Sequence, residues 1–184
     1  MLTDIFKMKK RGQIWYSDFV IGTMIFLVMI AVFYKYSANI QYQDKGLTNG
    51  LLTDAKLISS SLLDPGTPSN WTADNVARIG LTNGNHDLNE SKISVFYNMP
   101  YNSTKKLFGS RYDYYVYFEN RTRGIVNING SCGFGSIEVQ AVKTGEKCEN
   151  ISLASIDIEK LLKMTRIVSY RNDLNRMVIY TWLE

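Results

Sequence analysis

A single uncharged stretch near the N-terminus restricts what this chain can fold into more than any other feature. From Gln13 to Tyr34 there are 22 residues; Asp18 is the only charged one, and the 16 residues from Phe19 onward carry no charge. As an α-helix the segment would rise roughly 33 Å, close to the hydrocarbon thickness of a bilayer. The sequence therefore predicts a transmembrane helix, with a buried core helix of a soluble domain as the alternative.

The residues on either side of this segment predict its orientation. Four basic residues precede it and one follows it: Lys7, Lys9, Lys10 and Arg11 before, Lys35 after. Because positive charge marks the cytoplasmic side, we expect the N-terminus in the cytoplasm and the chain after Tyr34 outside the cell membrane, in a single-pass topology. No small-x-small cleavage site follows the apolar run, so the helix is expected to stay in the mature protein.

The residues that lead into the helix resemble a known kind of leader. Lys9-Lys10-Arg11-Gly12-Gln13, followed by Asp18 and the apolar run, is similar to an archaeal class III signal peptide, which is found on type IV pilin-like proteins and pseudopilins. In that family a prepilin peptidase-like protease cuts after the glycine, and the apolar helix becomes the core of a filament. The resemblance implies cleavage between Gly12 and Gln13, and a pilin-like fold of one long helix followed by a globular head.

Two positions depart from the pattern of that family. Its acidic residue sits fifth from the new N-terminus, whereas Asp18 is sixth, and Trp15 replaces the serine expected at the third position. These departures bear on ordinary filament polymerisation more than on cleavage.

Asp18 has a physical interpretation beside the resemblance. A carboxylate inside a transmembrane helix is costly and needs a partner. Cleavage would create an α-amino group on Gln13, and that group on one subunit could pair with Asp18 of a neighbour and fix the axial register of an assembly. The alternative is that Asp18 lies only about 7–8 Å along the helix from the cytoplasmic edge and is hydrated there.

The basic residues account for most of the net charge of +4. Residues 1–12 carry a net charge of +3, which leaves +1 for the remainder. No basic stripe with interleaved aromatic residues follows, so we expect membrane and other pilin-like subunits, including copies of this chain, as partners and no nucleic acid.

Features after the helix are typical of an exterior domain. Six Asn-x-Ser/Thr sequons lack proline at the middle position: Asn70, Asn89, Asn102, Asn120, Asn129 and Asn150. We expect two or three of them to be glycosylated. Cys132 and Cys148 would both lie outside, where a disulfide is favoured over two free thiols. Two cysteines and one histidine form no recognisable zinc pattern, so neither a metal nor a cofactor is expected.

The organisation of the chain predicts an α+β fold. Before the stop signal Asp64-Pro65-Gly66, apolar residues recur at helical spacing: Ile40, Leu47, Leu51, Ala55, Ile58 and Leu62. One helix is therefore expected from about residue 14 to 63. Residues 64–92 are expected to be loop-rich, 102–108 a short helix capped by Asn102-Ser103 and closed by Gly109, and 156–163 another short helix. Strands are expected over 111–119, 124–128 and 136–142, with a hairpin of 166–170 and 176–183. The expected divisions are a leader at 1–12, a transmembrane and extended helix at 13–63, and a mostly antiparallel head domain at 64–184.

Catalytic chemistry is not expected. His86 stands in a polar turn and is interpreted as a surface residue, and Gly133-Phe134-Gly135-Ser136 opens no helix that could hold a phosphate. Asp113, Glu119 and Glu138 could fall on strands, but a catalytic pair needs geometry. The tyrosine-rich strand over 111–119 is interpreted as one half-buried side of a sheet.

These observations support a structural subunit over two alternatives. The leading hypothesis is a type IV pilin-like or pseudopilin subunit that assembles through its apolar helix, possesses no enzymatic activity and displays its head outside an archaeal cell. The second hypothesis is a monomeric, membrane-anchored binding module such as an adhesin or receptor, and the third is an anchored extracellular hydrolase. The hydrolase would require a pocket with convergent titratable groups.

Overall fold

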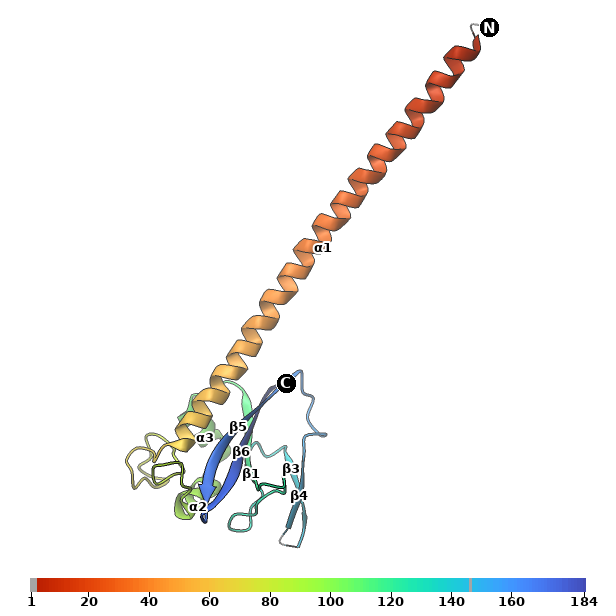
Figure 1. Ribbon diagram of the computed structural model, residues 1–184. Helices are drawn as coiled ribbons and strands as arrows, with labels where there is room; N and C mark the ends of the chain where they lie inside the picture. Colours follow the sequence, from red (N-terminus) through yellow and green to blue (C-terminus); the bar gives the residue numbers. More distant parts are fainter. Residues whose placement is uncertain (1–2, 146) are drawn as a thin grey trace. The chain divides into compact units, whose positions relative to one another are not determined.

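The computed structural model describes the backbone of residues 3–145 and 147–184 (Figure 1). Side chains are described for residues 16–37, 46–145 and 147–184. The chain divides into two compact units, Met1–Leu47 and Thr48–Glu184, and the second is called the head unit below.

The described residues of the first unit lie within helix α1, which extends over Thr3–Leu63. Among the described residues, this is the one helix long and apolar enough to cross a membrane, through a 22-residue segment from Tyr16 to Ser37 with a mean hydropathy of 2.1. No side chain in that window is buried by another part of the described chain. The predicted long apolar helix is therefore present, and its apolar side chains have no protein core around them.

The last turns of α1 belong to the head unit and carry the predicted apolar stripe. Leu51, Ala55, Ile58 and Leu62 are all buried at the predicted spacing of four, three and four residues. Their spacing places them on one face of the helix, which packs into the head core. Leu47 is partly buried, and Ile40 lies outside the described side chains.

The end of α1 is held by hydrogen bonds from a distant loop. The backbone carbonyl of Leu62 accepts from the Leu81 amide at 3.0 Å, and that of Leu63 accepts from the Thr82 hydroxyl at 2.8 Å. The last carbonyls of a helix have no partner within it, so this loop supplies the donors that the helix end lacks. Gly66, at a φ of 85°, then turns the chain away, as the stop signal predicted.

The head unit contains a four-stranded antiparallel sheet and a separate two-stranded hairpin, which confirms the α+β class (Figure 1). The sheet has the order β2-β1-β6-β5. Its strands are β1 (Asp113–Glu119), β2 (Phe134–Gly135), β5 (Lys160–Tyr170) and β6 (Asp173–Leu183), and the hairpin consists of β3 (Gln140–Thr144) and β4 (Lys147–Ser152).

Each face of the four-stranded sheet is covered by a different part of the chain. Alternate residues of β1 point to opposite sides. Tyr114 and Val116 join the larger core beneath α1, α2 (Glu90–Asn98) and α3 (Tyr101–Phe108). Tyr115 and Tyr117 join a second core that packs against the β3–β4 hairpin and the segment leading into β5. The sequence predicted a tyrosine-rich strand that is half-buried. The strand is present as β1, but it is buried on both faces.

Several predicted elements differ from the structure. Residues 156–163 are not a helix; Ile156 and Ile158 pack on the second core as an extended segment, and β5 begins at Lys160. In the sequence, apolar residues alternate with acidic ones here, so the period of two is the correct one. Residues 124–128 form isolated bridges rather than a strand, and the strand expected from residue 136 begins at Gln140.

The two short helices were predicted incompletely. Helix α2 begins at the end of the segment 64–92 that was expected to be loop-rich and continues to Asn98, where no element was predicted; its N-cap is Asn89, whose side chain accepts a hydrogen bond from the Lys92 amide. An asparagine cap was therefore the overlooked signal. Helix α3 begins at Tyr101 after Pro100 and lacks a side-chain cap, so the predicted Asn102-Ser103 cap is wrong, whereas Gly109 closes it in the left-handed conformation as predicted.

A disulfide joins the loop before β2 to strand β4. Cys132 and Cys148 are bonded, with their Cα atoms 5.6 Å apart and a sequence separation of 16 residues. The bond fastens the hairpin to the sheet, because Cys132 is buried beside β2 while Cys148 lies on β4.

Replacing both cysteines should destabilise the head unit. For Cys132→Ser with Cys148→Ser we expect the free energy of unfolding to fall by about 3 kcal/mol, the value for opening a loop of this length. Guanidinium unfolding of the full chain in detergent, followed through the fluorescence of the buried Trp71 and Trp182, measures the change. Dithiothreitol should cause the same loss in the wild type and none in the double variant; a loss below about 1 kcal/mol would contradict the prediction.

Candidate functional sites on the helix and in the head unit

The first candidate site is the apolar segment of α1 with its single carboxylate. Asp18 is exposed, and no other charged residue occurs in the Tyr16–Ser37 segment before Lys35. The Thr23 hydroxyl of the same segment donates locally to the Phe19 carbonyl at 2.8 Å. The side chains of the predicted cleavage residues Gly12 and Gln13 lie outside the described residues. Asp18 is therefore the polar group on which a contact with lipid headgroups, water or a neighbouring chain would centre.

The six sequon asparagines differ in their surroundings. Asn70, Asn102, Asn120, Asn129 and Asn150 are exposed, while Asn89 is partly buried. The Nδ2 atom is where a glycan attaches, and two of these atoms already donate hydrogen bonds at 2.6 Å: Asn89 to Asn83 Oδ1 and Asn129 to Ser94 Oγ. Glycosylation stays a prediction, with the more open asparagines as the better acceptors.

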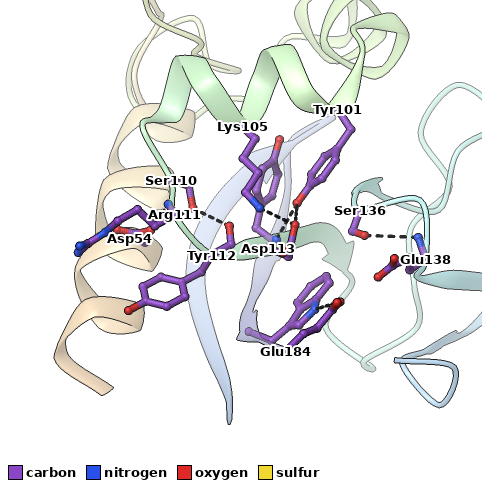
Figure 2. A network of polar contacts seen from close by, with 12 residues as sticks. Asp54, Tyr101, Lys105, Ser110, Arg111, Tyr112, Asp113, Ser136, Glu138 and Glu184 are labelled. Atoms are coloured by element: carbon purple, nitrogen blue, oxygen red, sulfur yellow. Dashed lines mark hydrogen bonds and ion pairs between the residues drawn. The ribbon is translucent and has the colours of Figure 1, made fainter. Parts of the chain in front are cut away.

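A polar network surrounds Asp113 at the start of β1 (Figure 2). From α3, the Tyr101 hydroxyl donates to Asp113 Oδ1 at 2.6 Å and Lys105 Nζ donates to the same oxygen at 2.7 Å. Burial of Tyr101, reinforced by the negative charge and hydrogen bond of Asp113, raises the pKa of its phenol above the ordinary range. The tyrosine therefore acts as a neutral donor that fixes α3 to β1.

Figure 2 also shows how α1 is connected to the loop before β1. The Asp54 carboxylate, 4% exposed, accepts from the Arg111 amide at 2.8 Å and from the Ser110 hydroxyl at 3.1 Å. A buried carboxylate is tolerated only when its oxygens are hydrogen-bonded, and these donors fulfil that need. Asp54 was not singled out in the sequence because nothing local distinguishes it from an exposed helix residue.

Of the three carboxylates considered for catalysis, Glu119 has other partners than Glu138, whereas the negative charge of Asp113 contributes to raising the pKa of Glu138. Glu119 accepts from the Tyr117 hydroxyl at 3.2 Å and faces Lys163 and Arg176, each with a closest N–O distance of 3.7 Å. Glu138 lies instead beside Glu184, a residue that sequence reasoning did not consider. Among the described residues, no group of three or more His, Cys, Asp or Glu side chains is placed to hold a metal ion. His86 is exposed in a turn, as expected.

A cavity of about 330 Å³ lies in the head unit beside the disulfide. Aromatic side chains from four elements line it: Phe96 and Tyr97 of α2, Tyr101 of α3, Tyr115 of β1 and Phe134 of β2. Cys132 also lines it, so the disulfide-bonded loop is part of its wall. The sequence did not predict this cavity, because its lining residues are spread over more than 40 positions. Its size falls at the lower end of the range for small-molecule sites.

Comparison with known proteins identifies no relative. No family model matches the chain, and neither a curated protein nor a solved structure matches it. The function must therefore be inferred from the helix, the head unit and the resemblance of the N-terminal residues to a leader.

The contact between Glu138 and Glu184 should make the stability of the folded chain depend on pH. A hydrogen bond from the Glu184 carboxyl and its negative charge raise the pKa of Glu138 above the ordinary value of 4.5. The folded chain therefore binds this proton more tightly than the unfolded chain. The resulting stabilisation is fully present below the ordinary pKa and is lost as the pH rises through the raised pKa.

Carboxyl-detected NMR titration of the full chain measures this pKa directly. Glu184→Ala should lower the titration midpoint of Glu138 toward 4.5, whereas Glu149→Ala, at an exposed glutamate of β4, should leave it unchanged. An equal midpoint for Glu138 in the wild type and in Glu184→Ala would contradict the assignment.

Proposed function

We propose that this protein is a membrane-anchored structural subunit of the type IV pilin-like or pseudopilin kind, with its head unit outside the cell. The observation that carries the proposal is helix α1, because one helix supplies both an exposed apolar segment over Tyr16–Ser37 and the buried stripe of the head unit. Exposed apolar surface of this extent is not stable in water and requires lipid or apolar neighbours. A membrane covers the apolar surface of the segment before assembly, and the same segments of other subunits cover it in a filament.

The N-terminal resemblance supports the same proposal. Lys9-Lys10-Arg11-Gly12-Gln13 stands directly before the apolar segment, in the order found in class III leaders. Cleavage after Gly12 by a prepilin peptidase-like protease would place a new α-amino group on Gln13 about 7–8 Å along the helix from Asp18. A carboxylate and an ammonium group of neighbouring subunits would then neutralise each other in an apolar surrounding.

A monomeric anchored binding module is the second candidate, and the cavity in the head unit favours it. Such a module needs the apolar segment only as an anchor, so Asp18 has no role in assembly. The two candidates therefore predict different effects of removing the Asp18 carboxylate.

Cleavage of the leader is tested by co-expression with a class III prepilin peptidase. N-terminal sequencing of the product should begin at Gln13, and Gly12→Val should block cleavage because a branched side chain replaces the glycine at the cut. Gly22→Val is the matched control, since a Cβ at Gly22 would meet nothing within 4 Å. A product that retains residues 1–12 in the wild type would contradict the leader assignment.

Assembly is tested by removing the carboxylate from the apolar segment. Asp18→Ala should abolish surface filaments in electron micrographs and reduce the subunit in the sheared fraction at least tenfold, while the amount in the membrane stays the same. Thr23→Ala, which removes a locally satisfied hydroxyl one turn further along, should assemble normally. Unchanged filaments in Asp18→Ala would refute the pairing, and the absence of filaments from the wild type would favour the anchored module.

A further inference from the structure

We propose that the cavity beside the disulfide binds one sugar ring of a neutral glycan. This inference goes beyond the structural role of the chain and holds whether or not the chain forms filaments. It depends on the hydroxyl groups that open into the cavity, on the rings that form its walls and on the charges of its lining.

Tyr115 places a hydroxyl group in the cavity without a partner inside the protein. Its side chain is 5% exposed, and among the described residues its hydroxyl makes no hydrogen bond. Among the described side chains, the hydroxyl of Thr181 is the one atom that is both fully enclosed and unpaired, so the Tyr115 hydroxyl is not fully enclosed, and Tyr115 lines the cavity. A polar group in this position needs a partner from outside the chain, which a ligand or water supplies.

The backbone around Tyr115 fixes where this hydroxyl lies. A Cβ atom on Gly133 would be 2.6 Å from Cε1 of the Tyr115 ring and 2.7 Å from the Val116 carbonyl oxygen. Only glycine therefore lets the ring lie this close to the loop before β2. The hydroxyl is positioned by close packing rather than by a hydrogen bond, which leaves both its donor and its acceptor capacity for a ligand.

Tyr97 provides a second phenol at the rim of the cavity. Tyr97 is a residue of α2 and is 48% exposed, and among the described residues its hydroxyl has no hydrogen-bond partner. Burial, followed by the negative charge that Tyr97 would carry when ionised, raises the pKa of Tyr115 to about 12. At neutral pH the Tyr115 phenol is uncharged, and a phenol hydroxyl both donates and accepts hydrogen bonds.

The charges of the lining disfavour an ionic ligand. Lys143 is the one charged side chain among the described lining residues, and its Nζ already donates to the Gly130 carbonyl at 2.6 Å. The described lining contains no carboxylate, guanidinium or imidazole group. A cationic ligand would therefore gain no counter-charge, and an anionic ligand would gain only this one exposed ammonium group.

The remaining lining is apolar and rigid. The rings of Phe96 and Phe134 pack edge to face with centroids 4.6 Å apart, and the Thr104 and Tyr114 hydroxyls are paired with each other at 2.6 Å. A wholly apolar ligand would leave the Tyr115 hydroxyl without a partner. A neutral sugar ring has C–H faces that pack on aromatic rings and hydroxyl groups that pair with phenols, so it fits both parts of the lining.

Binding is tested on the full chain in a phosphocholine detergent, because a glycoside detergent would itself compete. The probes are the methyl glycosides of glucose, galactose, mannose and N-acetylglucosamine, with methyl glucuronide as the charged comparison and p-cresol as the aromatic comparison. We expect at least one neutral glycoside to bind at millimolar concentration in saturation-transfer NMR, more strongly than the glucuronide and p-cresol.

Variants locate the bound sugar. Tyr115→Phe removes only the hydroxyl and should weaken binding about fivefold, and Tyr97→Ala should weaken it about fivefold to tenfold. Leu174→Ala, at an exposed apolar residue that lines a different cavity, is the matched control and should bind as the wild type does. Near-ultraviolet circular dichroism establishes that each variant is folded.

Three results would overturn the proposal. No binding of any neutral glycoside would refute the sugar site, and preferred binding of p-cresol would assign the cavity to an aromatic side chain of a partner protein. Unchanged affinity in both Tyr115→Phe and Tyr97→Ala would place any bound sugar elsewhere. None of these results bears on cleavage after Gly12 or on filament formation, so the two proposals fail independently.

Discussion

The apolar stripe on the last turns of α1 is the contact on which the head unit depends. Ile58 and Leu62 are fully buried in the larger core, where they meet the sheet residues Tyr114, Met177 and Ile179. Burying such side chains supplies the main favourable free energy of folding, and the helix shares this core with α2, α3 and the loop that precedes α2. The helix is therefore an integral part of the head core. Asp54 fixes the orientation of this contact, since its buried carboxylate accepts hydrogen bonds from Ser110 and Arg111 in the loop before β1.

This arrangement gives α1 two surroundings within one helix, which accounts for the function we propose. From Tyr16 to Ser37 its apolar side chains are exposed, whereas from Leu51 onward one face of the helix, with Leu51, Ala55, Ile58 and Leu62, is enclosed by the protein. Only an apolar medium outside the chain, either lipid or the helices of other subunits, can satisfy the first part. The hydrogen bonds of Asp54 to the loop before β1 and the loop that caps the end of α1 hold the second part in the head unit.

The disulfide and the cavity form a second level of organisation. Cys132 is part of the cavity wall, and its bond to Cys148 fastens the β3–β4 hairpin beside the sheet. Gly133 follows the cysteine directly and admits the Tyr115 ring at close range. A loop that the sequence shows only as glycine-rich therefore has a structural purpose: it brings an unpaired phenol hydroxyl against a rigid aromatic wall. Rigid, preformed sites of this kind bind small ligands without a large cost of ordering.

The sequence by itself determined the features that depend on local pattern. It predicted the apolar helix, the stop at Asp64-Pro65-Gly66, the antiparallel hairpin at the C-terminus and the pairing of the only two cysteines, because hydropathy, periodicity and turn residues act over a few positions. The predicted helix over residues 156–163 is wrong. The local sequence pattern there fits both a helix and a strand, and packing on the second core favours an extended chain. The cavity, the buried role of Asp54 and the contact between Glu138 and Glu184 were decided by tertiary structure alone. Each joins residues far apart in the chain, and such proximity arises only when the sheet, its helices and the hairpin have packed together.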